Sequence, residues 1–460
     1  MKHRKRDGWN LWIEPLFALA IAVGLAYSVG HLWYFGYLPQ PFFYEPFDIW
    51  ADWFNVVYWS YDKGTYDSWG ALYPPLTFVF LKIFSIGSCY PIAGGGVDGS
   101  AGLPARTCDW VGLVTFHGFY VLNIVLISLV FVKIDKRTAP WRAFALSAGF
   151  PMAEALERAN LVIVAFTCIL LAFGPLLKSA RLRWLAAGLA INFKVYLISA
   201  VFPQLLRRRW KWFEGAILAT IVIYLGTYAI LGRGAPWEIY DNIVNFSTLH
   251  QAGSFLDVWF AVTYTALISL LNNSDFPMIS LIGSRNVDLL LFILPLLLHI
   301  VQASILLAAA AAWLRPEAVP TYRLTNLGLC LALITSESGG YTQIFIFFFT
   351  FMEPWKGFGT KWAILMCYFL SIPLDIPVDR AVTTIVDTFI RGQTQIVTYY
   401  IMLGPFLRPL LIMTIPFALS CVTLRQVWFD IQRQGWKSRW RYRNDFPIMV
   451  GRGSPRRPLF

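Results

Sequence analysis

The chain has 460 residues, of which 57% are apolar and 14% charged, and its mean hydropathy is +0.56. These values exclude a set of soluble globular domains. The formal net charge of +12 could indicate nucleic-acid binding, but most of the excess lies between Lys2 and Arg6 and after Arg425. We therefore expect a membrane-topology signal, contacts with membrane lipids and no nucleic-acid partner.

Apolar segments long enough to cross a bilayer recur along the whole chain. Because both basic ends should stay on the cytoplasmic face, the number of crossings should be even, about ten to twelve. The prediction is an all-α polytopic protein with a transmembrane domain over residues 1–430 and a basic cytoplasmic tail over residues 431–460. The expected spans are Ile13–Leu32, Leu76–Ser88, Val111–Val132, Leu161–Leu177, Leu185–Leu206, Phe213–Leu231, Leu289–Leu314, Leu324–Thr335, Ile344–Met352, Ala363–Ile372 and Ile396–Leu424.

Charge in the loops orients these spans, because cytoplasmic loops carry the excess of Lys and Arg. The basic loops expected on the cytoplasmic face are Arg207 to Lys211, Arg315 to Arg323 and Lys356 to Lys361. The loops then expected on the external face are residues 33 to 72, Gly232 to Ser254, Ser336 to Tyr341 and Asp375 to Gln395.

Two segments do not fit this alternation. The basic patches Lys133 to Arg142 and Lys178 to Arg183 cannot both be cytoplasmic with a single crossing between them. We therefore expect a broken or re-entrant segment in the front half of the chain. Phe255–Leu271 fits poorly as a span and is expected to form a re-entrant or surface helix.

Cysteine and histidine positions give no metal-ligand spacing, so neither a metal site nor another cofactor is expected. Four cysteines lie in apolar runs, where a thiol behaves as a small hydrophobic group. Cys89 and Cys108 bracket a Gly/Pro-rich insertion. They would form a disulfide if that loop faces an oxidising compartment, and otherwise remain free thiols.

The loop over residues 33–72 is acidic and dense in aromatic residues. An acidic loop after a cytoplasmic amino terminus should be external, and its aromatic rings favour the bilayer interface. The polar and apolar spacing over Phe47 to Tyr58 predicts a short helix in the membrane surface, with Asp48, Asp52 and Asn55 on one face. An ordinary interfacial helix with solvated carboxylates explains the same pattern.

Three motifs in this loop carry a family resemblance. Asp48 follows the first span, Gly64-Thr65-Tyr66 comes about sixteen residues later, and Tyr73-Pro74-Pro75-Leu76 opens the next span. Together they resemble the first external loop of GT-C glycosyltransferases that use polyprenyl-phosphate sugars. The resemblance is greatest to the branch of the phosphatidylinositol-mannoside α-1,2-mannosyltransferases.

Motifs later in the chain extend the resemblance over most of its length. Glu157-Arg158-Ala159-Asn160 resembles the Glu-Arg-Gly-Asn element of that branch, with Ala159 in place of the glycine. Lys194-Val195-Tyr196 resembles its Lys-x-Tyr-Pro element, with Leu197 in place of the proline. Gly339-Gly340-Tyr341 resembles a later external turn.

The resemblance implies a GT-C-like bundle in the plasma (bacterial inner) membrane with its active site on the external face. It implies transfer of a sugar, mannose as the first choice, from a polyprenyl-phosphate carrier to a lipid-linked or glycan acceptor. Such a reaction needs a base for the acceptor hydroxyl, and one carboxylate opposite the leaving phosphate gives inversion. The resemblance assigns this base to Asp48. Asp52 is the alternative, or positions the sugar.

Cationic groups and hydrogen-bond donors should stabilise the leaving phosphate. The substrate-binding candidates besides Asp52 are Tyr73, Glu157, Arg158, Asn160, Lys194 and Tyr341, with Arg233, Arg391 and Arg408 as further cations. Lys194 lies well inside an apolar run, which marks a functional candidate, although pairing with Glu157 or snorkelling to the interface explains it equally. Glu157 and Asn160 could simply begin a helix.

Two other classes of function remain open. A transporter or flippase of a lipid-linked glycan should show internal pseudo-symmetry with broken helices in matching positions of two halves, and no such duplication is apparent in the sequence. A non-catalytic assembly subunit should not depend on either aspartate.

Overall fold

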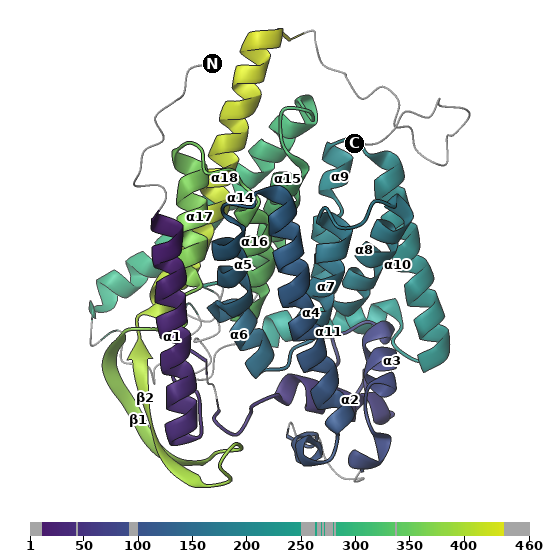
Figure 1. Ribbon diagram of the computed structural model, residues 1–460, viewed down its shortest axis with the longest axis vertical. Coiled ribbons are helices and arrows are strands. Elements are labelled where there is room, and N and C mark those ends of the chain that lie inside the picture. Colours follow the sequence, from purple (N-terminus) through teal and green to yellow (C-terminus); the bar gives the residue numbers. More distant parts are fainter. Residues whose placement is uncertain are drawn as a thin grey trace.

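The computed structural model describes residues 12–42, 45–91, 100–249, 263–264, 268, 271, 279, 282–335 and 338–436 (Figure 1). The two basic chain ends and most of Phe255–Leu271 therefore lie outside the described residues. Within them, five helices are long and apolar enough to cross a membrane, as expected for an integral membrane protein. These are α1 (Ile13–Phe35), α4 (Trp110–Ile134), α10 (Trp210–Leu231), α14 (Ser284–Leu314) and α18 (Gly404–Gln434).

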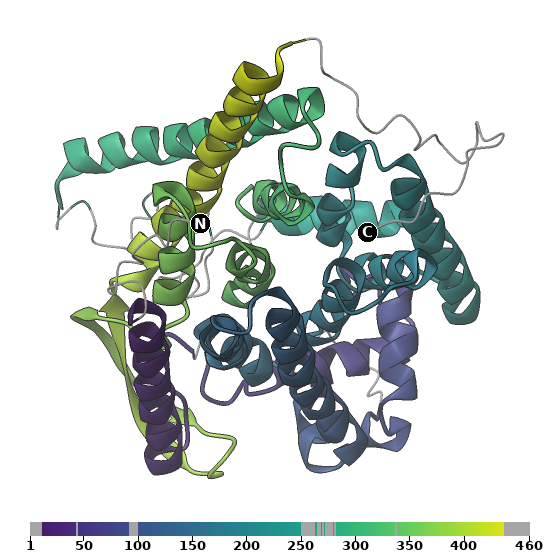
Figure 2. The same ribbon diagram turned by 45° about the horizontal axis from the view of Figure 1, so that its top comes forward.

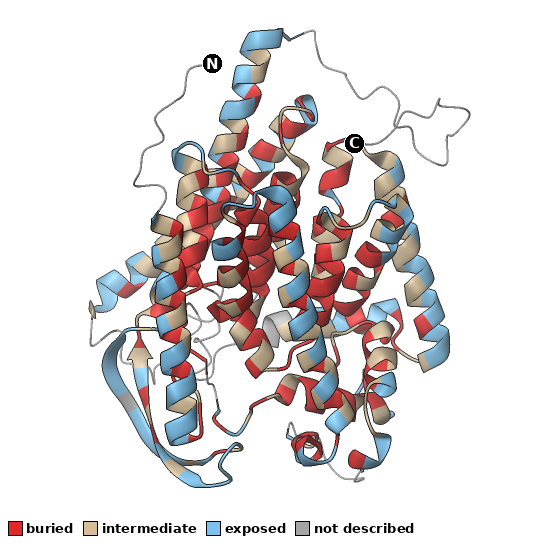
Figure 3. Ribbon diagram, viewed as in Figure 1, coloured by how far each residue is buried: buried red, intermediate tan, exposed pale blue. Residues whose placement is uncertain are grey.

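Shorter apolar helices form the centre of the bundle (Figure 3). Every residue of α16 is buried, whereas leucines of α1, α10 and α14 project outward, as on a lipid-facing surface. The coarse prediction of a helical membrane protein is confirmed. The shorter helices are α7 (Val162–Phe173), α8 (Ala180–Phe193), α9 (Pro203–Leu206), α15 (Thr321–Leu333), α16 (Gln343–Phe351) and α17 (Phe358–Leu370).

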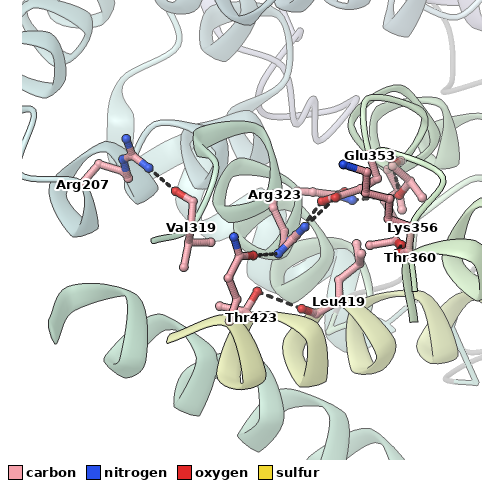
Figure 4. A network of polar contacts seen from close by, with 12 residues as sticks. Arg207, Val319, Arg323, Glu353, Lys356, Thr360, Leu419 and Thr423 are labelled. Carbon is pink, nitrogen blue, oxygen red and sulfur yellow. Dashed lines mark hydrogen bonds and ion pairs between the residues drawn. The ribbon is translucent and has the colours of Figure 1, made fainter. Parts of the chain in front are cut away.

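One end of the bundle, which we call the basic pole, gathers the basic loops predicted to share a face. Arg323 forms a buried ion pair with Glu353 at 2.6 Å, and Arg207 donates to the carbonyl of Val319 (Figure 4). Arg142 donates to the same end of α16, at the carbonyl of Glu353. The opposite end carries Asp48 and Asp52, and we call it the aspartate pole.

A broken crossing explains the two basic patches of the front half. The chain runs from the basic pole through α5 (Ala139–Ala148) and α6 (Phe150–Glu157), turns, and returns in α7. Helix α5 ends at Gly149, and the amide of Phe150 donates to Ser371 instead of continuing the helix. Both patches therefore lie at the basic pole, which confirms the expectation of a broken segment.

The first loop contains α2 (Ala51–Tyr61) and ends in α3 (Pro75–Ile83). The prediction of a helix in the membrane surface was wrong in part, because α2 begins after Asp48 and is largely buried. Trp53 and Phe54 are fully buried, and η3 (Leu103–Thr107), which follows η2 (Gly87–Cys89) in the chain, packs against α2. Asn55 accepts from the amide of Gly102 and serves this packing.

A β-hairpin replaces two predicted features near the end of the chain. Strands β1 (Pro377–Asp387) and β2 (Thr394–Met402) pair antiparallel and lie beside α1 (Figures 1 and 2). The predicted external loop is thus a strand, and the span predicted from Ile396 begins only at Gly404. Side chains alternate along β2, with Val397 and Tyr399 buried and Ile396 exposed, which is the period of a strand.

The segment Pro236–Leu249, helix α11, lies against the first loop. The side chain of Asn242 donates to the carbonyl groups of Tyr66 and Ala71 at 2.9 and 3.2 Å. The hairpin also reaches this loop, because Gln40 exchanges two hydrogen bonds of 2.9 Å with the backbone of Tyr400. The segments predicted to be external therefore gather at the aspartate pole.

Candidate functional site

Arg158 joins the two aspartates of the first loop. Its Nη2 donates to Oδ1 of Asp52 at 2.9 Å, and its Nη1 donates to Oδ2 of Asp48 at 3.4 Å. The side-chain amide Nδ2 of Asn160 donates to Oδ2 of Asp52 at 2.6 Å. About a fifth of each carboxylate is exposed, with side-chain values of 21% for Asp48 and 22% for Asp52. The pair is thus accessible but only partly solvated.

The backbone fixes this arrangement as firmly as the side chains do. The amide of Trp50 donates to the carbonyl of Glu157 at 2.8 Å, and the amide of Asp52 donates to that of Arg158 at 3.1 Å. Trp50 and Ala159 both have positive φ values, 64° and 48°. Such values are unfavourable for residues with a Cβ, and at Ala159 they reverse the chain between α6 and α7.

Arg106 holds the turn that presents Asp48. Its side chain is buried and donates to the carbonyl groups of Phe47 and Ile49 at 2.7 and 2.8 Å. The guanidinium also lies over the ring of Phe389, 3.9 Å from its centre. Cys108, two residues further on, forms a disulfide with Cys89, so the bridged alternative for this pair is the one observed. The insertion thus ties the Asp48 turn to α2 and α4.

Lys194 lies near Asp52 because a helix ends there. It follows Phe193 as the C-cap of α8, with φ −142° and ψ 105°, and the chain continues as a 3-10 helix, η4 (Val195–Ala200). Its Nζ donates to the hydroxyl of Tyr73 at 3.4 Å and lies 5.9 Å from the ring centre of Tyr341. Asp52 is near enough to interact with it electrostatically. A buried cation is thus placed within electrostatic reach of Asp52.

Tyr73 is positioned by the Gly64-Thr65-Tyr66 motif. The hydroxyl of Thr65 donates to the carbonyl groups of Trp59 and Asp62, both at 2.8 Å, and closes the turn after α2. The hydroxyl of Tyr66 donates to the carbonyl of Tyr73 at 2.9 Å. Burial raises the pKa of the Tyr73 hydroxyl, so this group stays protonated and can donate a hydrogen bond.

A second layer of charge lies behind Arg158. Neither carboxylate oxygen of Glu154 has a hydrogen-bond partner among the described residues, and Oε2 of Glu157 has none either. A Cβ at Gly340, in η6 (Gly340–Thr342), would lie 2.4 Å from Oε2 of Glu154, which explains the glycine of the later motif. Arg408 forms an ion pair with Asp375 at 2.7 Å. Its guanidinium is also close enough to attract the carboxylate of Glu154.

The structure brings most of the predicted site residues together. Asp48, Asp52, Arg158 and Asn160 meet directly, and Tyr73, Lys194 and Tyr341 form an adjoining group. Glu157 contributes its carbonyl to the Asp48 turn. Arg233 donates to the carbonyl of Ser60 and Arg391 donates to that of Trp33, so neither joins the described contacts of the aspartates.

Two residues of this site were missed at the sequence level. Arg106 lies in a Gly/Pro-rich insertion that reads as a flexible loop, and its proximity to Cys108 was the only signal for it. Glu154 lies one helical turn before Glu157 and was hidden in a segment with no predicted helix. Among the described residues, no group of three His, Cys, Asp or Glu side chains could hold a metal ion.

Comparisons with protein-family models, with curated proteins and with solved structures find no match for this chain. The function is therefore inferred from the residues and geometry of the site and from the motif resemblance.

Proposed function

We propose that the protein is a membrane glycosyltransferase of GT-C type. It transfers one sugar, mannose by the motif resemblance, from a polyprenyl-phosphate carrier to a lipid-linked or glycan acceptor. The observation that carries the proposal is the convergence of Asp48 and Asp52 on Arg158, beside the buried ammonium of Lys194. A carboxylate base next to cations suits a reaction in which a hydroxyl attacks and a phosphate leaves.

Asp48 is the better base of the two. Both oxygens of Asp52 accept short hydrogen bonds, from Arg158 and Asn160, at 2.9 and 2.6 Å. Asp48 accepts only the 3.4 Å contact on Oδ2, and among the described residues nothing donates to its Oδ1. An oxygen without a donor is free to take the proton of an acceptor hydroxyl. Asp52 then orients Arg158 and the sugar.

Lys194 and Tyr73 are suited to the leaving phosphate. The Nζ of Lys194 is buried, with the residue only 9% exposed, so its charge acts in a low-dielectric environment. Tyr73 adds a neutral donor 3.4 Å away. Asp48 takes the proton of the acceptor hydroxyl, and the acceptor oxygen bonds to the anomeric carbon as the C–O bond to the phosphate breaks, so the anomeric carbon inverts. The phosphate oxygen gathers the negative charge, which Lys194 and Tyr73 stabilise.

The placement of charge supports an external active site. The basic pole carries the loops whose Lys and Arg content favours the cytoplasm, and the aspartate pole is the opposite end of the bundle. A polyprenyl carrier presents its phosphate at the membrane surface, and this is where the aspartates lie in the proposed orientation.

The decisive variant is Asp48→Asn, which keeps the size of the side chain and removes its basicity. The full chain, purified and reconstituted in liposomes, should lose at least about a hundredfold in turnover of polyprenyl-phosphate mannose because it lacks the base. Asp67→Asn, an exposed aspartate of the same loop, is the matched control and should retain turnover. Equal turnover by the two variants would contradict Asp48 as the base and point to Asp52. No turnover by the wild type would contradict the transferase and favour transport of a lipid-linked glycan.

A further inference from the structure

A cavity lies at the basic pole, far along the bundle from the aspartates. Its volume is about 270 Å³, it is partly open, and it lies between the ends of α7 and α16, the beginnings of α8, α10 and α15, and α9. Its polar wall includes Arg183, Gln204, Arg209 and Thr325. The glycosyl-transfer site uses none of these residues.

The polar wall is built for a ligand that is negatively charged. Arg183 and Arg209 are close enough to repel each other, and no described carboxylate forms an ion pair with either. Arg323, another arginine of this pole, is neutralised by its ion pair with Glu353 (Figure 4). Two unneutralised guanidinium groups beside a cavity favour an anion.

Buried polar atoms in the same wall lack hydrogen-bond partners among the described residues. Gln204 is 2% exposed and Thr325 is fully buried, yet in the described part of the chain nothing pairs with Oε1 of Gln204 or Oγ1 of Thr325. The same holds for Nε of Arg183, although its Nη2 donates to the carbonyl of Gly174. Because unpaired buried polar groups are costly, the cluster indicates a ligand whose phosphate oxygens accept from Arg183 and Thr325 and whose hydroxyl donates to Oε1 of Gln204.

Apart from Thr321 and Tyr322, the remaining wall is apolar. Phe173 packs 5.4 Å from Trp212 and 5.8 Å from Phe349, measured between ring centres, and all three line the cavity. The volume approaches the lower end of small-molecule pockets, about 300–1,000 Å³. It therefore accommodates a head group and the first part of an apolar chain, but not a whole lipid.

We propose that this cavity binds the phosphate of an anionic phospholipid from the leaflet at the basic pole. The two guanidinium groups contact the phosphate, and the start of the acyl chain lies against Phe173 and Trp212. Planar guanidinium groups match phosphate geometry, and basic pockets between membrane helices commonly hold lipid head groups. This inference stands independently of the glycosyltransferase proposal.

Native mass spectrometry of the full detergent-purified chain tests the inference. Wild-type protein titrated with phosphatidylglycerol should bind one molecule in preference to phosphatidylcholine. Arg209→Gln, which removes one charged donor, should weaken binding of phosphatidylglycerol at least about tenfold. Arg181→Gln removes an exposed charge from the same helix as Arg183 and should bind like the wild type.

A second variant guards against a folding defect. Gln204→Glu is nearly isosteric and places a carboxylate beside the two arginines, so it should keep or raise the melting temperature while it abolishes phosphatidylglycerol binding. Equal binding by wild type, Arg209→Gln and Gln204→Glu would overturn the assignment. Stabilisation by inorganic phosphate to the same extent as by phosphatidylglycerol would overturn the lipid as the source of the phosphate.

Discussion

Arg158 donates to Oδ1 of Asp52 at 2.9 Å, although 106 positions separate the two residues in the chain. This contact joins the first loop to the turn between α6 and α7, and the backbone bond from Asp52 to the carbonyl of Arg158 reinforces it. The site therefore depends on a tertiary contact between two segments that were independent motifs in the sequence.

The first prediction concerns the coupling between Arg158 and Asp52. Arg158→Gln should lower the free energy of unfolding by about 2–3 kcal/mol, below the cost for a fully buried pair because both carboxylates are partly solvated. The double variant with Asp52→Asn should recover part of this loss, because it removes an unpaired carboxylate. Thermal unfolding in detergent measures both effects. Strictly additive losses would contradict the coupling.

The second prediction concerns the turn at Ala159, which has a φ of 48° and is fully buried. Ala159→Gly should raise the free energy of unfolding by up to about 1 kcal/mol, because glycine adopts this conformation without a steric penalty. Ala159→Val should lower it by more than about 2 kcal/mol, since a β-branched side chain adds strain and overpacks the turn. A stable valine variant would show that the turn does not have this conformation.

The third prediction separates charge from hydrogen bonding at the leaving group. Lys194→Met should lower kcat at least about a hundredfold, because the phosphate loses its cation in the transition state. Tyr73→Phe keeps the ring beneath the ammonium, 4.5 Å from Nζ, and should lower kcat by less than about tenfold. Lys82→Met, at an exposed position on α3, is the control. A normal kcat in Lys194→Met would remove Lys194 from the mechanism.

The fourth prediction concerns the disulfide between Cys89 and Cys108, which closes a loop with a sequence separation of 19. Replacing both cysteines with serine should lower the free energy of unfolding by about 3 kcal/mol. It should also lower turnover, because Arg106 would hold the Asp48 turn less firmly. Cys421→Ser, at an exposed free cysteine, should change neither quantity. An unaltered melting temperature after reduction would contradict this role of the bridge.

The longest helices could be predicted from the sequence because the bilayer requires long apolar runs. Helices α5 and α6 could not, because their charges lower the hydropathy of the segment. Arg142, for example, is neutralised inside the bundle by Glu14 at 2.9 Å, a partner 128 positions away. The composition of the segment around Arg142 does not reveal a partner so distant in the sequence.

The predicted start of the last span, at Ile396, was wrong for a different reason. The run from Ile396 to Met402 is as apolar as a membrane helix, and its alternation of exposed and buried residues appears only when β1 pairs with it. At the candidate site, the motifs named Asp52, Arg158 and Asn160 as substrate-binding candidates, and hydrogen bonds join the three side chains in the structure. Their spacing alone would not have joined them, because the hydrogen bonds form across the fold.

The most direct measurement is the reaction itself. Wild-type protein in liposomes, supplied with polyprenyl-phosphate mannose and a lipid acceptor, should release polyprenyl phosphate and form a glycoside of inverted anomeric configuration, as followed by NMR. Asp48→Asn should abolish both products. No release of polyprenyl phosphate from any polyprenyl-phosphate sugar, or a glycoside of retained configuration, would contradict the account.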